Sequence, residues 1–238
     1  MLPTVLRRPL AEKIGFAAAH HWPRILANSH DDIIDEISCL FPGWGRDEFE
    51  TIRSPYPLQH YADRVTQVFC NSVNAYEICN LLAREPVGQK IIFTGGGLLK
   101  NPLSANPQLE FLHVHPGFLP HVKGADGILW SMLIRGKIGA SIISMDAGLD
   151  TGDVLFQKEW QIPAITYTRD EIDGETLYRI IYSFLDPVCR SVILEQFLSE
   201  NINLTWTKMP QKNNVGLLCH FMHKRIRTRI LKRIFKKN

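Results

Sequence analysis

Long hydrophobic runs are missing from this chain of 238 residues. No apolar stretch approaches the roughly 20 residues that a helix needs to cross a bilayer. The first residues also lack the charged and apolar segments and the cleavage site of a signal peptide. We therefore expect a cytoplasmic protein. Apolar residues make up 45% of the chain and charged residues 21%, an ordinary globular composition that argues against overall disorder.

Cysteine and glycine motifs are also scarce. The five cysteines are scattered, with no C-x-x-C pair, which argues against a disulfide framework or a zinc knuckle and favours reduced, mostly buried thiols. Gly95-Gly-Gly97 is neither a G-x-G-x-x-G fingerprint nor a Walker loop. We interpret it as a turn at a strand end.

Acidic residues are absent from one end of the chain. Residues 224–238 hold eight of the 27 basic residues and no acid, so the rest of the chain carries 19 bases against 24 acids, a net charge of −5. Apolar residues recur at helical spacing just before and through this basic segment: Leu218, Met222, Ile226, Ile230 and Ile234, with Leu231 and Phe235 beside them. Such a helix has an apolar stripe opposite a cationic face.

Three interpretations of the basic C-terminal helix stay open. The continuity of its apolar stripe favours contact with an anionic membrane surface, on the inner face of the membrane. Contact with nucleic-acid phosphates is a weaker alternative. A solvated, frayed end of the chain is the third.

The pattern of apolar residues predicts an α/β fold. Runs of apolar residues predict strands at residues 90–94, 111–114, 140–145 and 154–160. Helical spacing predicts helices at residues 124–135 and 175–185, the second continuing to Leu198 with a bend at Pro187. Alternating strands and helices indicate a mostly parallel sheet covered by helices. We divide the chain into an irregular N-terminal extension (1–65), a catalytic domain (66–200) and a C-terminal segment (201–238).

Two segments carry the residues best suited to chemistry. Phe111-Leu-His-Val-His-Pro-Gly-Phe-Leu-Pro120 reads as a buried strand that ends in two histidines and a tight turn. Met145-Asp-Ala-Gly-Leu-Asp-Thr-Gly-Asp153 reads as a second strand end followed by a loop rich in Asp and Gly. Ionisable groups at separate strand ends, beside backbone that bends sharply, are how α/β folds build active sites. The sequence therefore predicts an enzyme.

These segments resemble the core of the formyltransferase family, which includes methionyl-tRNA formyltransferases and sugar-nucleotide N-formyltransferases. The family pattern is Asn-x-His-x-x-x-Leu-Pro followed by Leu-Asp-x-Gly at a similar distance. Here the first motif is His113-Val-His-Pro-Gly-Phe-Leu-Pro120 and the second is Leu149-Asp-Thr-Gly152. The resemblance extends from about residue 90 to 185. It implies a Rossmann-like catalytic domain.

The resemblance also implies a reaction, the transfer of a formyl group from 10-formyltetrahydrofolate to an amine. On this basis His115 is the acid/base and Asp150 is the carboxylate that fixes and charges its ring. Four consecutive residues of the first motif and one glycine of the second would lie against the folate: Gly117, Phe118, Leu119, Pro120 and Gly148. The chain departs from the family at His113, where the family has asparagine. We expect His113 to take over as donor to the oxyanion through Nε2–H.

Other functions stay open beside formyl transfer. His113 and His115 lie two residues apart in a strand and so face the same side, which suits two metal ligands. With Asp146 or Asp150 as the third ligand, they would build a metal-dependent hydrolase. A catalytically silent, folate-binding module is the other alternative. For the transferase, about forty residues after the long helix favour a small acceptor such as an amino-sugar nucleotide.

Overall fold

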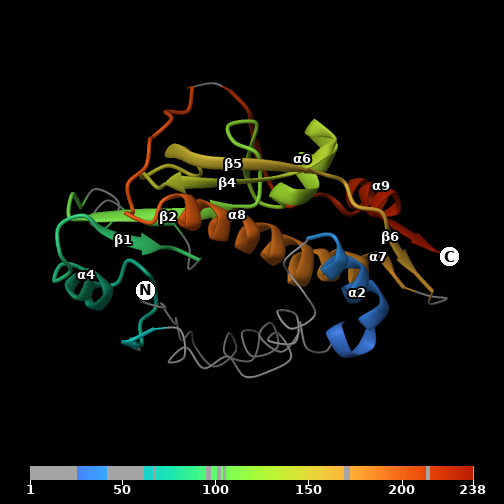
Figure 1. Cartoon of the computed structure of the whole chain (residues 1–238), viewed down its shortest axis with the longest axis horizontal. Helices are drawn as coiled ribbons and strands as arrows, with labels where there is room; N and C mark the ends of the chain where they lie inside the picture. Colours follow the sequence, from blue (N-terminus) through green and yellow to red (C-terminus); the bar gives the residue numbers. More distant parts are fainter. Residues whose placement is uncertain are drawn as a thin grey trace.

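The computed structural model describes residues 26–41, 62–66, 68–94, 98–100, 103, 106–168, 172–212 and 215–237. Most of the expected N-terminal extension and the turn at residues 95–97 lie outside these ranges. Within them, helices surround a small sheet (Figure 1). No described helix combines the length and the apolar composition required to cross a bilayer.

The central sheet has four strands in the order β1-β2-β4-β5. Their bounds are β1 Gln89–Ile92, β2 Leu109–His115, β4 Lys137–Ser144 and β5 Asp153–Gln161. Strands β1 and β2 are parallel, whereas β2–β4 and β4–β5 are antiparallel. The expected α/β class is confirmed. The described sheet is nevertheless mixed where a mostly parallel one was expected, because β5 returns directly from β4 through the loop at residues 145–152 without a helical crossover.

Strand β4 is buried on both faces and separates the helical core from the site. Ala140 and Ile142 point to one face, where they pack with Ile193 and Phe197 of helix α8 (Asp186–Glu200). The other face of β4 carries Ser141, which is fully buried beside the turn that follows β2. The alternation of side chains along a strand thus gives one face to packing and the other to the turn.

The remaining described elements flank this sheet. They are helices α2 Asp31–Cys39, α4 Tyr76–Leu82, α6 Gly127–Arg135, α7 Gly174–Ile180 and α9 Lys224–Ile234, and short strands β3 Val122–Gly124, β6 Ile165–Tyr167, β7 Leu217–Cys219 and β8 Phe235–Lys237. Strand β7 pairs with β3 and β8 pairs with β6, both in parallel. The C-terminal part of the chain therefore pairs twice with strands from the middle of the chain.

The expected long helix is present and is distorted before its proline. Helix α7 continues through a π-helical turn, η2 Ile181–Leu185, into α8, which ends at Glu200. Pro187 lies in the first turn of α8. Because proline has no N–H and its ring crowds the carbonyl four residues earlier, the wider turn of η2 accommodates it.

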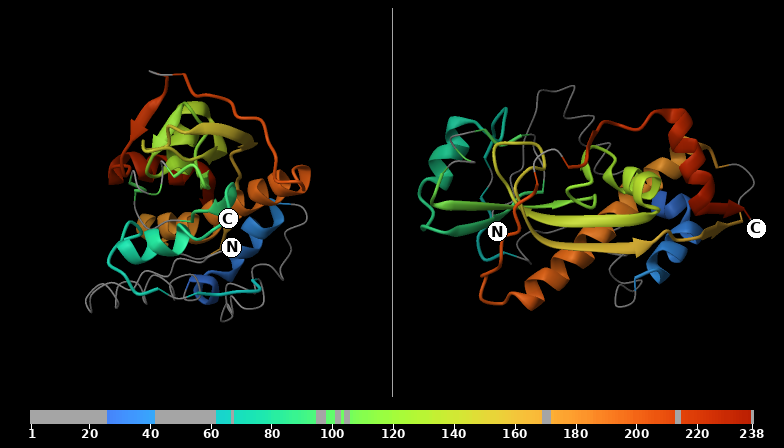
Figure 2. Two further views of the ribbon diagram at one scale, coloured as in Figure 1. Left: turned by 90° about the vertical axis from the view of Figure 1, so that its left-hand side faces the viewer. Right: turned by 90° about the horizontal axis from the view of Figure 1, so that it is seen from above.

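The basic C-terminal helix is present, but its apolar stripe is largely occupied. Helix α9 lies at the same end of the molecule as α2 and α7 (Figures 1 and 2). Most of its stripe belongs to the main hydrophobic core: Met222, Ile230, Leu231, Ile234 and Phe235. Core residues of α2, Ile33, Ile34 and Ile37, belong to the same cluster. The stripe is thus used for folding, while cations such as Arg225 and Arg229 remain exposed.

Glu110 at the start of β2 joins three distant parts of the chain. It forms ion pairs with Lys90 and, at 2.7 Å, with Lys208, and accepts a hydrogen bond from the Ser144 hydroxyl at 3.0 Å. Burial raises the pKa of Glu110, but the hydrogen bonds from Lys208, Lys90 and Ser144 outweigh it and lower the pKa to about 2. Glu110 therefore stays ionised in the folded protein at acid pH values that protonate it in the unfolded chain.

We expect Glu110→Gln to lower the free energy of unfolding at pH 7 by about 1.5–3 kcal/mol, the range for hydrogen bonds to charged groups. Because the folded pKa is depressed, this contribution is complete above a pH of about 4.5 and is lost as the pH falls toward about 2. Urea unfolding of both proteins at pH 7 and pH 3 measures it. The exposed Glu77→Gln is the control. An equal deficit at both pH values would contradict the electrostatic explanation.

Candidate active site

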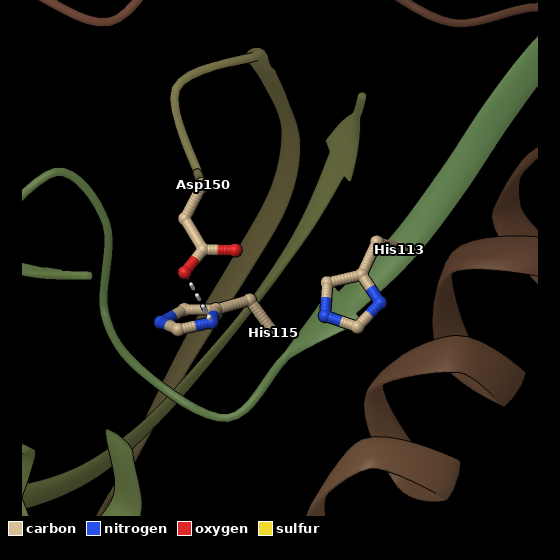
Figure 3. A group of neighbouring side chains, drawn as sticks. All are labelled: His113, His115 and Asp150. Carbon is tan, nitrogen blue, oxygen red and sulfur yellow. Dashed lines mark ion pairs between the residues drawn. The ribbon is translucent and has the colours of Figure 1, made fainter. Parts of the chain in front are cut away.

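The expected site residues meet at the ends of adjacent strands. His113 and His115 lie at the end of β2, and Asp150 lies in the loop between β4 and β5 (Figure 3). Asp150 has a left-handed backbone conformation, with φ of 54°. This conformation is uncommon for residues other than glycine, although Asp and Asn tolerate it better than most. The loop thereby turns the Asp150 carboxylate toward His115.

His115 and Asp150 form a buried pair. His115 Nδ1 lies 3.4 Å from Asp150 Oδ2, and the two side chains are only 2% and 9% exposed. The pair is fixed by backbone groups of β3: His115 Nε2–H donates to the Val122 carbonyl at 2.9 Å, and the Gly124 N–H donates to Asp150 Oδ2 at 2.7 Å. Both polar side chains are therefore held at two points.

Burial sets the charge of His115. Removal of the ring from water lowers the pKa of His115 below its ordinary value, and the negative charge of Asp150 and the Val122 carbonyl oppose this shift without reversing it. The neutral ring keeps its proton on Nε2, because the Val122 oxygen can only accept. Its lone pair at Nδ1 then faces the carboxylate. Two electron-rich atoms meet across 3.4 Å, an arrangement that a proton or another cation between them would stabilise.

His113 is the half-buried member of the group. Its Nδ1–H donates to the Phe93 carbonyl at 3.0 Å, and its other ring nitrogen turns toward His115 and Asp150 (Figure 3). The neutral ring therefore presents a lone pair at Nε2 and has no N–H to offer there. This changes the role expected for His113: it can donate to an oxyanion through Nε2 only when the ring is protonated, a requirement that asparagine does not have.

The turn after β2 supports His115. A methyl group on Gly117 would lie 2.5 Å from His115 Nε2, so glycine is required for the imidazole to sit where it does. Ser141 secures this turn: its hydroxyl donates to the Gly117 carbonyl at 2.7 Å and accepts from the Leu119 N–H at 3.0 Å. The Leu119 side chain is fully buried. Contact of Leu119 with a bound folate stays a prediction.

The other expected folate residues differ in accessibility. Phe118 and Pro120 are half-buried, and the Phe118 ring stacks on His121 with centroids 6.2 Å apart. Gly148 is exposed, and a methyl group there would lie 1.9 Å from the Thr151 hydroxyl. That hydroxyl donates to Asp146 Oδ1 at 2.6 Å. Asp146 thus makes its hydrogen bonds within its own loop. Among the described residues, the group that could hold a metal ion consists of Asp150 and both histidines, and Asp146 is not part of it.

Several groups that shape the site were missed from the sequence. Gln211 Nε2–H donates to the Asp150 carbonyl at 2.9 Å and to the Gly152 carbonyl at 2.7 Å, which ties the loop that carries Asp150 to the C-terminal part of the chain. The backbone carbonyls of Phe93 and Val122 orient the two histidines. Backbone groups have no signature in a sequence, and a single glutamine about sixty residues from the loop carries no motif.

The comparisons with known proteins concern the region that carries these residues. Residues 65–178 match the model of the formyl transferase family, and this region contains all three site residues. Methionyl-tRNA formyltransferase from Prochlorococcus marinus is 38% identical over 125 residues, which cover 50% of this chain and 35% of that protein. The corresponding enzyme from Syntrophus aciditrophicus is 41% identical over 75 residues, which cover 31% and 24%. The chain thus spans about a quarter to a third of these relatives.

Other matches include a dehydrogenase and the solved structure of a further formyltransferase. Cytosolic 10-formyltetrahydrofolate dehydrogenase from Xenopus tropicalis is 45% identical over 74 residues, which cover 31% of this chain and 7% of that protein. Among solved structures, a formyltransferase from Anoxybacillus kamchatkensis, in complex with a formamido-sugar nucleotide and tetrahydrofolate, is 23% identical with a TM-score of 0.44, and the overlap covers 71% of this chain and 83% of that one. The similarity to the formyl transferase family rests on the match in sequence.

We expect Gly117→Ala to lower the free energy of unfolding by about 1–3 kcal/mol, as overpacking of a filled site does. The added methyl group must displace either the His115 ring or the Val122 carbonyl, which would lie 2.9 Å away. Gly174→Ala is the control, because its methyl group meets only the Thr228 hydroxyl at 3.9 Å. Urea unfolding measures both variants. Equal stability of the two would show that the turn does not confine the imidazole.

Proposed function

We propose that the protein transfers a formyl group from 10-formyltetrahydrofolate to an amine. The observation that carries the proposal is the buried contact between His115 and Asp150, inside the region that matches the formyl transferase family. A paired imidazole and carboxylate at a strand end is suited to moving one proton during attack on a carbonyl carbon. The folate is the formyl donor.

The reaction balances around a single proton. The amine nitrogen attacks the formyl carbon and forms a new carbon–nitrogen bond, which gives a tetrahedral oxyanion. The bond from that carbon to N10 of the folate then breaks, and the proton lost by the amine passes to N10. His115 Nδ1 accepts this proton in transit, and Asp150 stabilises the imidazolium that forms.

His113 controls the approach to this pair. It is half-buried, whereas His115 and Asp150 are buried, so we infer that the reacting groups enter from the side of His113. Its position two residues before His115 on β2 is where the family carries asparagine. In this role a protonated His113 stabilises the oxyanion, and a neutral His113 does not.

We propose that the acceptor is a small molecule, such as an amino-sugar nucleotide, rather than a tRNA. Charge supports this preference: outside residues 224–238 the chain carries 19 bases and 24 acids, and a net negative body repels a long polyanion more than a small one. The match to methionyl-tRNA formyltransferases makes methionyl-tRNA the acceptor to test beside it. Contact with an anionic membrane surface stays a prediction, and it would rest on the exposed cations of α9 and on Phe221, which is 72% exposed.

We expect His115→Gln and Asp150→Asn each to lower kcat/KM for amine-dependent tetrahydrofolate release by about 10²–10⁴-fold, the contribution of a positioned acid/base. Asp150→Asn removes the charge but keeps an oxygen that can accept from Gly124 N–H. Absorbance of released tetrahydrofolate, with amino-sugar nucleotides and methionyl-tRNA as acceptors, measures the rate. The exposed His223→Asn is the control. Undiminished rates in both site variants, or release without any amine, would contradict the proposed function.

We expect His113→Asn to raise the turnover of formyl transfer by about tenfold or more. The amide supplies an N–H to the oxyanion at every pH, whereas the neutral His113 ring presents a lone pair at Nε2. The same tetrahydrofolate assay under saturating donor measures kcat. A loss of turnover would show that the imidazole has a task of its own in the reaction.

A further inference from the structure

Both histidines of the site are arranged as metal ligands usually are. A histidine that binds a metal gives its second ring N–H to a carboxylate or a backbone carbonyl, which fixes the tautomer and aims the lone pair at the ion. His113 Nδ1–H donates to the Phe93 carbonyl at 3.0 Å, and His115 Nε2–H donates to the Val122 carbonyl at 2.9 Å. Each ring therefore has one nitrogen engaged by the backbone and one lone pair free for a ligand.

The two free nitrogens and a carboxylate converge on one space. One ligand atom from each of His113, His115 and Asp150 lies within 4.8 Å of the other two. The rings come from the same strand face and the carboxylate from the facing loop, so the three groups surround a common point (Figure 3). His115 Nδ1 and Asp150 Oδ2 are 3.4 Å apart, a separation that two ligands of one tetrahedral zinc ion, each about 2 Å from the metal, would have.

The charge of this space also suits a cation. It contains two imidazole lone pairs and a carboxylate. The Gly124 N–H donates to Asp150 Oδ2 at 2.7 Å, as hydrogen bonds to a ligating carboxylate do in metal sites. No described lysine or arginine side chain makes an ion pair with Asp150. Two nitrogens and one oxygen are the donor set of open zinc sites.

We propose that His113, His115 and Asp150 bind one divalent transition-metal ion, with Zn²⁺ as the best match to two imidazoles and one carboxylate. Zn²⁺ takes four tetrahedral ligands, so three protein ligands leave one position for water or substrate. His113 is the residue that makes the site possible, because an asparagine at this position would supply only a weak carbonyl ligand. If the protein transfers formyl groups as proposed above, the ion competes with the proton for His115 Nδ1 and inhibits the reaction.

Metal binding to the full-length protein tests the proposal directly. Calorimetric titration with Zn²⁺, after removal of metal by a chelator, should give one ion per chain in the wild type, and Co²⁺ should give the visible absorption of a low-coordinate nitrogen-bound ion. We expect His113→Asn and Asp150→Asn each to weaken Zn²⁺ binding at least 100-fold. His223→Asn is the matched control, because it makes the same change at an exposed histidine, where asparagine can still cap α9.

The outcomes separate the two proposals. Absence of stoichiometric Zn²⁺ binding in the wild type, or equal affinity in the wild type and His113→Asn, would overturn the metal site. Circular dichroism of each variant identifies a loss of binding that is due to unfolding. If His113→Asn is unfolded, His113→Gln replaces it. Formyl transfer without metal binding would support the proposed function and overturn the metal site. Metal binding without formyl transfer would support the metal site and contradict the proposed function. Inhibition by one equivalent of Zn²⁺ in the wild type but not in His113→Asn supports both together.

Discussion

The structure of the site depends on one buried contact, between His115 Nδ1 and Asp150 Oδ2 at 3.4 Å. A carboxylate and an imidazole lose their water when they are buried, and this cost is offset only if backbone groups satisfy their remaining hydrogen-bonding atoms. Strand β3 supplies both partners, a carbonyl for the ring and an N–H for the carboxylate. The glycine at 117 leaves room for the ring, and the left-handed backbone at Asp150 brings the loop back to it.

Strand β3 is in turn held by the C-terminal part of the chain. It pairs with β7, and a side chain on Gly124 would collide with the Cys219 carbonyl at 2.2 Å, so the two backbones can approach as they do only because residue 124 is glycine. Gln211 ties the loop that carries Asp150 to the same part of the chain. The apolar side of α9 anchors the segment in the main core. The C-terminal segment, which looked like a separate basic element, therefore supports the candidate site.

One residue decides how the space beside this pair is used. Two lone pairs and a carboxylate favour a positive charge between them, and either a proton or a metal ion can supply it. With asparagine at position 113 the site would hold a neutral donor for an oxyanion, as in the family pattern. With histidine it holds a third strong ligand instead. The same local geometry thus supports both the formyl transfer and the metal site that we propose.

The sequence by itself determined the approximate positions of the four strands of the central sheet and of the main helices, together with the two motifs, because apolar periodicity and turn residues are local properties. These features predicted the α/β class and the long helix interrupted near Pro187. They also identified His113, His115 and Asp150 as candidate site residues. Tertiary structure alone decided which ring nitrogens are free, since backbone carbonyls from distant residues fix the tautomers. It also decided that Leu119 and the stripe of α9 are buried and that the described sheet is mixed, because strand partners and burial are set by long-range contacts.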